Sequence, residues 1–311
     1  MNRTLASFRP FTHLKSASEP IEIVKAKDSL LFDRNGKRYI DAIASWWVIT
    51  HGHCHPHIVN AVKVAAERLD QIVFANFTHA PARALLDELS HMLPEEFVAA
   101  FFSDNGSTDV LKAARAKGIL VIFDEVMTGF YRTGYRFAFE ALNFVPDILC
   151  LSKGLTGGFL PLSLTLCHDK VFQQFWHDDK ARTFFHGHTF TANPLSCAAA
   201  AANLQLMGDS VEKSVSSIEQ LHRHRIENIK SSLIKEKRMC GTIAILELHG
   251  RDGYLSSASQ LISSYCMKHG VFLRPIGNIV YIMPPFCITD AELSYVWDVV
   301  ESAISIIGDD R

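Results

Sequence analysis

Two residues that could do chemistry follow two short apolar runs of the sequence. Asp124 comes directly after the run 119–123, and Lys153 comes directly after the mainly apolar run 147–152. Both runs read as buried strands, so each polar residue stands at a strand's carboxyl end, where open α/β sheets bind ligands. An amine that forms a Schiff base and a carboxylate that holds a pyridinium nitrogen are what pyridoxal 5'-phosphate requires. Lys153 alone reads as a surface lysine before glycines, but the two strand ends together predict a cofactor site.

A third polar stretch lies upstream of these two residues. Gly106, Ser107 and Thr108 stand between an expected strand, 97–102, and a helix-forming stretch. Free backbone N–H groups and hydroxyls at the start of a helix can bind a phosphate group. An ordinary helix N-cap is the alternative reading of the same residues. Because the stretch precedes Asp124 in the same expected sheet, we predict that it binds the phosphate of the cofactor.

The composition is that of a globular enzyme. The 311 residues are 48% apolar and 21% charged, which is enough for a large core and about two domains. A net charge of −2 without a basic stripe argues against a nucleic-acid binder. The longest uncharged stretch, 183–208, is interrupted by polar residues and is no membrane span, and residues 1–10 show no secretory signal. Seven scattered cysteines without a Cys-x-x-Cys pair predict reduced thiols in a cytoplasmic protein.

The alternation of strand and helix patterns predicts an α/β fold. We expect a mostly parallel sheet with flanking helices in a large domain, residues 45–208. Residues 209–311 are expected to form a smaller α+β domain that the N-terminal segment 1–44 joins. The expected helices are 55–69, 81–92, 193–207, 209–236, 255–269 and a last one opened by a capping box from Thr289 to Glu292, and the expected strands are 97–102, 119–123, 147–152, 242–248, 271–274 and 279–283.

Motifs along nearly the whole chain resemble one enzyme family. They include Asp41 to Trp47, Thr78 to Pro81, Ser103 to Thr108, Asp124 to Phe130 with Arg132 to Gly134, Pro146 to Gly154, Phe185 to Phe190, Asn193 to Leu195, Arg274-Pro275 and Tyr281 to Pro285. The chain resembles the class III, fold-type I aminotransferases, which depend on pyridoxal 5'-phosphate. The lysine and aspartate motifs are shared by the whole class. Ser45-Trp46-Trp47 and Met283-Pro284-Pro285 resemble the branch of the class that acts in biotin synthesis.

The resemblance implies a role for each matching residue. Lys153 would be the catalytic lysine that bonds to the cofactor and moves the proton, and Asp124 would pair with the pyridinium nitrogen. Gly106 and Ser107 would hold the phosphate. His188 and Thr189 would reach the cofactor from the other subunit of a homodimer. The substrate would be bound by Trp46, Gly187, Arg274 and Phe11, with Arg274 as a bidentate clamp on a carboxylate.

The resemblance also implies the substrates. The branch transfers the amino group of S-adenosylmethionine to 8-amino-7-oxononanoate and gives 7,8-diaminononanoate. One alternative within the fold is an ω-aminotransferase that acts on ornithine, 4-aminobutyrate or a diamine. A second alternative, from a different class of function, is a homologue without catalytic activity.

Several of these residues have an ordinary structural reading. Trp47 is expected to be a core aromatic residue, Glu125 to be structural, and His222 and His224 to face solvent on their helix. Arg274 could be a surface charge at a strand end. The cluster His51, His53, Cys54, His55 and His57 looks like a metal site, but so many ligands within seven residues cannot converge on one ion, so no metal is predicted.

The sequence departs from the family at one large gap and two single positions. Only fifteen residues separate Thr108 from Asp124, where family members carry a long segment that includes a Tyr-His-Gly motif for stacking on the cofactor. That motif is absent here, so the large domain is predicted to lack an internal block after Val110. Phe11 replaces a usual tyrosine, and His188 replaces a usual proline.

Overall fold

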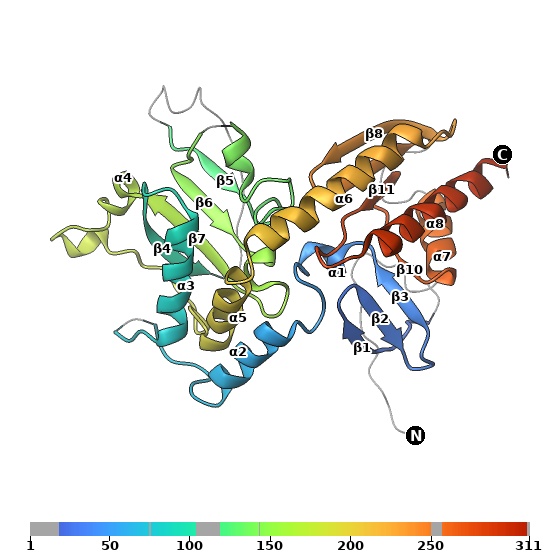
Figure 1. The fold of residues 1–311 in the computed structure, drawn as a ribbon. Coiled ribbons are helices and arrows are strands. Elements are labelled where there is room, and N and C mark those ends of the chain that lie inside the picture. The colour runs from blue at the N-terminus through green and yellow to red at the C-terminus, as the bar shows by residue number, and fades with distance from the viewer. Residues whose placement is uncertain (1–18, 75, 104–118, 143, 250–256, 310–311) are drawn as a thin grey trace, which may run out of the picture.

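A computed structural model describes residues 19–74, 76–103, 119–142, 144–249 and 257–309 of the chain. The described residues form two lobes (Figure 1), with the sheet of β4 to β7 in one lobe and the remaining strands in the other. The long helix α6, Asp209–Asn228, runs from the first lobe along the second. No helix in these ranges is both long enough and apolar enough to cross a bilayer.

The first lobe is built on a sheet of four strands in the order β4-β7-β6-β5. The strands are β4 Phe97–Ser103, β5 Ile122–Asp124, β6 Ile148–Leu151 and β7 Ser163–His168. Only β5 and β6 pair in parallel, whereas β7 is antiparallel to both β6 and β4. The described sheet is therefore more mixed than the mostly parallel sheet that the sequence predicted, because β7 turns back along β6.

The helices of the first lobe lie around this sheet (Figure 1). They are α2 Pro56–Ala66, α3 Ala80–Met92, α5 Pro194–Leu204 and the short α4 Asp169–Phe172, with 3-10 turns at Ala138–Leu142, Lys153–Thr156 and Lys180–Arg182. Helix α5 starts where Asn193 caps two backbone N–H groups and Pro194 fixes the first turn. Its run of alanines lets it pack closely, and almost all of its residues are buried. It thus lies directly behind the loop that carries Lys153.

The second lobe has two sheets and three helices. One sheet has the order β1-β2-β3-β10 and the other the order β11-β9-β8. The strands are β1 Ile23–Lys27, β2 Leu30–Asp33, β3 Arg38–Asp41, β8 Ile234–Cys240, β9 Ile243–Leu248, β10 Val271–Phe272 and β11 Ile279–Ile282, and α6 is joined by α7 Ser257–Lys268 and α8 Asp290–Asp309. The capping box of α8 is confirmed, since Thr289 and Glu292 exchange backbone-to-side-chain hydrogen bonds.

Each lobe has its own hydrophobic core. One core draws its buried side chains from residues 82–204. The other draws them from residues 40–43 and 211–304, together with Tyr131. The N-terminal strand β3 pairs in parallel with β10, which ties the first described residues to the C-terminal lobe. The division into domains at residues 44 and 208 stays a prediction, and these two cores support it.

Two predictions about α6 and the chain after it are wrong. The helix was expected to reach residue 236, but it ends at Asn228, and Ile234–Cys240 forms strand β8. The charged residues of 234–240 favour a helix by themselves, but pairing with β9 makes the segment a strand. Ion pairs from Lys235 and Arg238 to Glu247 cross between these strands.

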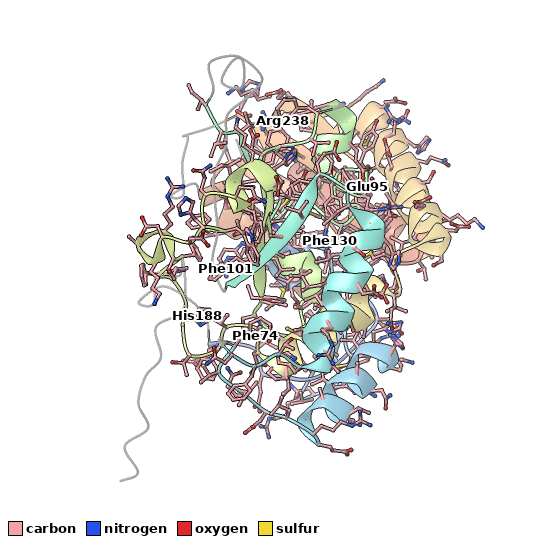
Figure 2. All side chains as sticks on the ribbon, turned by 90° about the vertical axis from the view of Figure 1, so that its left-hand side faces the viewer. Phe74, Glu95, Phe101, Phe130, His188 and Arg238 are labelled. Atoms are coloured by element: carbon pink, nitrogen blue, oxygen red, sulfur yellow. The ribbon has the colours of Figure 1, made fainter. Side chains whose placement is uncertain are left out.

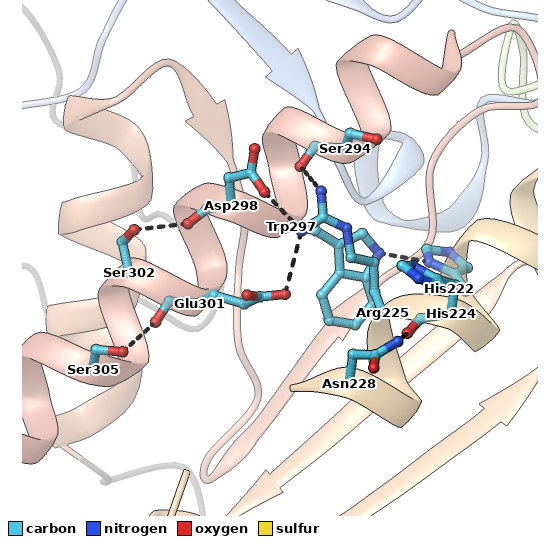
Figure 3. Close-up of polar contacts among 10 residues, drawn as sticks. All are labelled: His222, His224, Arg225, Asn228, Ser294, Trp297, Asp298, Glu301, Ser302 and Ser305. Carbon is cyan, nitrogen blue, oxygen red and sulfur yellow. Dashed lines mark hydrogen bonds and ion pairs between the residues drawn. The ribbon is translucent and has the colours of Figure 1, made fainter. Parts of the chain in front are cut away.

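His222 was expected to face solvent, and this expectation is also wrong. The side chain is fully buried between α6 and α8 (Figure 3). Trp297 donates its indole N–H to His222 Nδ1 over 3.0 Å, and His222 Nε2 lies 3.1 Å from the carbonyl oxygen of Thr242. Burial lowers the pKa of His222 to about 4, so the ring is neutral. His224, two residues on, is exposed as predicted.

The loop 131–134 joins the two lobes. The guanidinium of Arg132 is buried, and it donates to the carbonyl oxygens of Ile49 at 2.6 Å and Pro284 at 2.9 Å. Beyond it, Gly241 at the tip of the β8–β9 hairpin touches the backbone of this loop so closely that any side chain there would overlap it. With a φ of +55°, Gly241 also occupies the left-handed region that glycine tolerates best.

Candidate active site

Asp124 and Lys153 lie at the same edge of the first lobe's sheet, as predicted. Asp124 ends β5, and Lys153 begins the turn that follows the neighbouring parallel strand β6. Lys153 is half-buried, and burial lowers the pKa of its ammonium group, while the nearby Asp124 carboxylate acts in the opposite direction. The Asp124 carboxylate accepts the backbone N–H of Val126 over 3.0 Å. The structure thus holds an amine with lowered basicity beside a carboxylate.

The loop that carries Lys153 is fixed from behind by α5. Asn203 is fully buried, and its side-chain N–H groups donate to the carbonyl oxygens of Gly154 at 2.9 Å and Leu155 at 3.2 Å. Its carbonyl oxygen accepts the hydroxyl of Thr50 over 2.9 Å. Gly157 follows with a φ of +63°, and a side chain there would overlap the Asn203 amide. The backbone around Lys153 is therefore held by a buried polar network.

The residues Ala44–Trp47, α1, form one turn of left-handed helix. Their φ angles are 48°, 45°, 68° and 75°, and none of the four is glycine. Trp47 and Val48 donate their N–H groups to the carbonyl oxygens of Ile43 and Ala44, as in a helical turn. Such a turn costs roughly 1–2 kcal/mol per residue for L-amino acids, so it persists only where its surroundings hold it.

The left-handed turn brings two tryptophans to two cations. The Lys153 ammonium lies 5.0 Å from the centre of the Trp47 ring. The Arg274 guanidinium lies 5.0 Å from the centre of the Trp46 ring. Trp47 packs against the C-terminal core as expected, and its ring meets Tyr281 edge-on at 5.9 Å. The contact of Trp47 with Lys153 was not predicted from the sequence.

The expected residues Gly187, His188 and Thr189 line a different cavity. This cavity of about 530 Å³ is also lined by Phe74 and Phe101. Figure 2 shows Phe74, Phe101 and His188 on the same side of the first lobe. Lys153, Trp46 and Arg274 are not among the described residues that line this cavity. The remaining expected site residues, Gly106, Ser107 and Phe11, lie outside the described residues.

Glu125, next to Asp124, has a structural role. It is buried and accepts hydrogen bonds from the Thr128 hydroxyl and from the backbone N–H groups of Ala138 and Phe139, at 2.7–2.9 Å. Burial raises its pKa. These bonds fix the loop that follows β5, in agreement with the structural role that was predicted.

The histidine-rich stretch does not gather around one point. His53 Nε2 lies 2.9 Å from Asp41 Oδ2, whereas His57 Nε2 lies 3.0 Å from Gln205 Oε1. His51 is largely buried, and burial lowers its pKa to about 4. Within the described residues, no group of three or more His, Cys, Asp and Glu side chains has the geometry of a metal site.

Asn203 contacts the loop of Lys153 and Asp41 contacts Ser45 of α1, but neither was predicted as a site residue from the sequence. Asn203 could have been found as the one amide within the alanine-rich run 197–204, since a lone polar residue in a buried helix needs partners. Asp41 begins the matched motif 41–47, but nothing in that motif indicates a left-handed turn.

The described groups suit pyridoxal 5'-phosphate. Its aldehyde needs an amine that is partly deprotonated, and Lys153 supplies an amine whose pKa is lowered by burial. Its pyridine nitrogen needs a carboxylate, and Asp124 supplies one on the adjacent strand. The donor set therefore fits this cofactor.

Comparison with known proteins agrees with this reading. The model of the family described as Aminotransferase class-III matches residues 13–116 and 108–304. The adenosylmethionine-8-amino-7-oxononanoate aminotransferase of Synechococcus elongatus is 32% identical, and the alignment covers 96% of this chain and 98% of the relative. The similarly named enzyme of Methanocaldococcus jannaschii has a crystal structure with a TM-score of 0.88 at 23% identity, covering 96% of this chain and 97% of that one. A PLP-bound amine transaminase from an uncultivated Pseudomonas species has a TM-score of 0.87 at 18% identity, covering 99% and 100%.

The same comparison supports the predicted internal gap, which stays a prediction. The alignment with the Synechococcus enzyme has 416 positions, and this chain has 311 residues, so at least 105 positions hold no residue of this chain. The two matches to the family model meet at residues 108–116, where the sequence predicted the gap.

The structural neighbours confirm the fold, and the family model together with the 32% identical relative settles the membership. Lys153 and Asp124 lie at the ends of two adjacent parallel strands. The chain belongs to the class III aminotransferases, which depend on pyridoxal 5'-phosphate.

Proposed function

We propose that this protein transfers the amino group of S-adenosylmethionine to 8-amino-7-oxononanoate and so forms 7,8-diaminononanoate for biotin synthesis. The observation that carries the proposal is the 32% identity, over nearly the full length of both chains, with a relative named for these two substrates. The geometry supports it, because the left-handed turn carries Trp47, which contacts Lys153, next to Trp46, which contacts Arg274. An acceptor with a keto group and a distant carboxylate can place the keto group toward Lys153 and the carboxylate toward Arg274.

The roles of the site residues follow from this arrangement. When bound, the cofactor supplies the electron sink that lets an amino group leave one carbon and join another. Asp124 holds the pyridinium nitrogen, and Lys153 Nζ takes the proton from the carbon that bears the donor's amino group. The lowered pKa of Lys153 increases the fraction of the amine that can act as this base. Trp46 lines the substrate site, Gly187 lines it together with His188 and Thr189 from the partner subunit, and Arg274 binds the carboxylate through two N–H groups.

The phosphate and the second subunit complete the proposed site. We assign Gly106 and Ser107 to the phosphate of the cofactor and Phe11 to substrate binding, and we assign His188 and Thr189 to the site of the partner in a homodimer. An exposed aromatic cluster lies near His188 in the chain and supports the dimer. It consists of Phe175, Trp176, Phe184, Phe185 and Phe190, of which Phe185 is 83% exposed. Apolar surface of this kind is typical of a subunit interface.

One observation favours a second candidate function. At least 105 positions of the alignment with the Synechococcus relative hold no residue of this chain, and the Tyr-His-Gly motif that the family resemblance leads us to expect is absent from the sequence. A protein without it could be a homologue that folds without catalytic activity. The intact Lys153, Asp124 and Arg274 favour the enzyme instead.

Single-turnover assays of the two half-reactions test the proposal. They are run on the 311-residue chain and on a block-restored chain, in which the internal block of the Synechococcus relative is inserted between Val110 and Leu111. We expect S-adenosylmethionine to convert the bound cofactor to its amino form and 8-amino-7-oxononanoate to convert it back. Conversion by ornithine, 4-aminobutyrate or a diamine instead would refute the substrate assignment. Failure of every donor with both chains would support the homologue without activity.

Mixing inactive variants tests the contribution of the second subunit. Lys153→Ala and Thr189→Ala are each expected to be inactive or nearly so. If Thr189 serves the partner's site, mixed dimers contain one site with both residues intact, and activity returns on mixing. Absence of any recovery from verified mixed dimers would place Thr189 in its own chain's site or outside it.

A further inference from the structure

The left-handed turn of α1 is anchored by one buried carboxylate. Asp41 ends β3, and its side chain is completely buried. Its Oδ2 accepts the hydroxyl of Ser45 over 2.7 Å, and its Oδ1 accepts the backbone N–H of Ile43 over 3.3 Å. His53 Nε2 lies 2.9 Å from Oδ2 and supplies a third polar partner. The carboxylate thus binds a side chain inside the turn and the backbone just before it.

The backbone of Asp41 and its partner His53 are both held in place by backbone hydrogen bonds. The backbone N–H of Asp41 donates to Ser29, and β3 pairs with β2 and β10. His53 is fixed by two backbone hydrogen bonds with Asp28, of 2.7 and 3.2 Å. The anchor is therefore part of the C-terminal lobe's sheet, whereas the turn reaches out from it toward Lys153 of the other lobe.

We infer that Asp41, supported by His53, is a positioning residue, which through Ser45 holds the left-handed turn so that Trp46 lies against Arg274 and Trp47 lies against Lys153. The inference rests on the proposed function for its effect on substrates. Four successive non-glycine residues with positive φ do not stay in this conformation by themselves. The only hydroxyl in the turn is that of Ser45, and it is bonded to Asp41. Loss of this bond should release both tryptophans together.

Two substitutions of Ser45 separate anchoring from other effects. Ser45→Ala removes the hydroxyl but keeps the Cβ atom that disfavours a φ of +45°. Ser45→Gly removes the hydroxyl too, but glycine adopts positive φ readily, so the turn can persist without its anchor. His53→Gln keeps a side-chain N–H donor for Asp41, and His53→Ala removes it. If the Ser45 hydroxyl contributed to fold stability alone, Ser45→Ala and Ser45→Gly would damage the protein equally, or Ser45→Gly would damage it more.

The readout is the environment of the two tryptophans, measured without substrate. Trp176→Phe serves as the background, because Trp176 is 71% exposed and would dominate quenching. The variants are made in the 311-residue chain or in the block-restored chain, whichever is soluble. Acrylamide quenching of tryptophan emission should rise at least twofold in Ser45→Ala. Near-ultraviolet circular dichroism should fall at the same time. Ser45→Gly and His53→Gln should stay close to the parent, and His53→Ala should resemble Ser45→Ala.

Kinetics supply the second readout. Ser45→Ala should raise the KM for the keto acid about tenfold, with a smaller change in kcat, and Ser45→Gly should recover most of this loss. Unchanged quenching in Ser45→Ala, or equal effects of Ala and Gly, would overturn the inference. If Ser45→Ala does not fold, the comparison of His53→Ala with His53→Gln tests the same anchor. Failure of the substrates with an intact tryptophan signal would refute the proposed function and leave the positioning role standing.

Discussion

The buried amide of Asn203 donates a 2.9 Å hydrogen bond to the carbonyl oxygen of Gly154, the residue after Lys153. The same amide donates a second hydrogen bond to the carbonyl oxygen of Leu155, so one side chain of α5 binds two successive carbonyl groups of the loop that carries Lys153. The loop begins with Lys153 at a φ of +40°, which is unusual for a lysine. The position of the lysine is thus set by a helix more than forty residues further along the chain.

Replacement of Asn203 by aspartate should disturb Lys153 without removing bulk. Aspartate still accepts from Thr50, but it replaces the amide nitrogen and its two N–H donors by an oxygen acceptor that faces the carbonyl groups of Gly154 and Leu155. We expect a loss of about 1–3 kcal/mol in the free energy of unfolding, measured in urea, and weaker cofactor binding. Asn228→Ala is the control, because Asn228 is exposed and bonds only along its own helix (Figure 3). An Asn203→Asp protein as stable as the parent would contradict the network.

Lys153→Ala should abolish covalent attachment of the cofactor. Borohydride reduction of the parent protein should fix the cofactor to the peptide that contains Lys153, because the lysine supplies the only amine that we assign to it. Peptide mass spectrometry locates the adduct. Lys170→Ala, which alters an exposed lysine, should leave the adduct intact. A reduced adduct in the Lys153→Ala protein would move the attachment to another lysine.

Arg274→Ala should impair one half-reaction more than the other. Loss of a charge-assisted bidentate contact corresponds to about 2–3 kcal/mol, or a fall of roughly 30- to 150-fold in kcat/KM for the keto acid. The donor half-reaction should be nearly unchanged. Arg274→Lys keeps the charge and loses the planar fork, so it should recover only part of the activity. Equal damage to both half-reactions would indicate that Arg274 is structural.

His222 should make the protein less stable in mild acid. Its pKa is about 4 in the folded protein and about 6.5 in the unfolded chain. Between these values the unfolded chain binds more protons, so the free energy of unfolding falls as the pH falls below about 6.5. The free energy of unfolding should be about 3 kcal/mol lower near pH 4 than at neutral pH because of His222, and above pH 7 this residue should cause no loss. His51, whose pKa is also lowered to about 4, should add a loss of the same sign.

Urea unfolding between pH 4 and 7.5 measures this effect. His222→Gln should reduce the slope of stability against pH, although it also loses the bond from Trp297. His224→Gln, on the exposed side of the same helix, should leave the slope unchanged (Figure 3). A His222→Gln protein with the parent's slope would show that other groups control the acid sensitivity.

The missing block should leave the 311-residue chain poorly soluble or weak in cofactor binding. Among the described strands, β5 has β6 as its only neighbour, and Ile119 and Leu120, which precede it, are exposed. Even ~1,000 Å² of uncovered apolar surface would cost roughly 25 kcal/mol, which exceeds the ~5–15 kcal/mol by which a domain is usually stable. The block-restored chain should be soluble and should bind the cofactor.

Expression of both chains side by side tests this prediction. Cofactor absorbance and a thermal melt give the readouts, and the intact mass of the natural protein tells which form the cell makes. A soluble 311-residue protein that melts cooperatively, with full cofactor absorbance and turnover, would show that the block is dispensable.

The sequence was sufficient where local pattern and chemistry coincide. Asp124 and Lys153 each follow a short apolar run, and both runs are strands of one sheet with the polar residue at its edge. The helices α2, α3 and α5 were predicted to within a few residues, because a proline or cap marks each beginning. Such signals depend only on neighbouring residues.

The sequence was insufficient where distant contacts decide the conformation. Nothing local in Ala44 to Trp47 indicates positive φ, since glycine is absent and the turn depends on Asp41. Strand β8 is rich in charged residues, and its pairing with β9 decides its conformation. His222 was a missed signal, because it continues the buried stripe of Val211, Val215 and Ile218 at helical spacing.

Arg132 links the unfolding of the two lobes. Its buried guanidinium is bonded to carbonyl groups of Ile49 and Pro284, which belong to segments on either side of the first lobe in the sequence. If either segment separates, the buried guanidinium loses one of these two hydrogen bonds, and an unsatisfied buried cation is costly. Although each lobe has its own core, partial unfolding of one therefore destabilises the other. A single cooperative transition is the expected behaviour, and proteolysis should yield few stable single-lobe fragments.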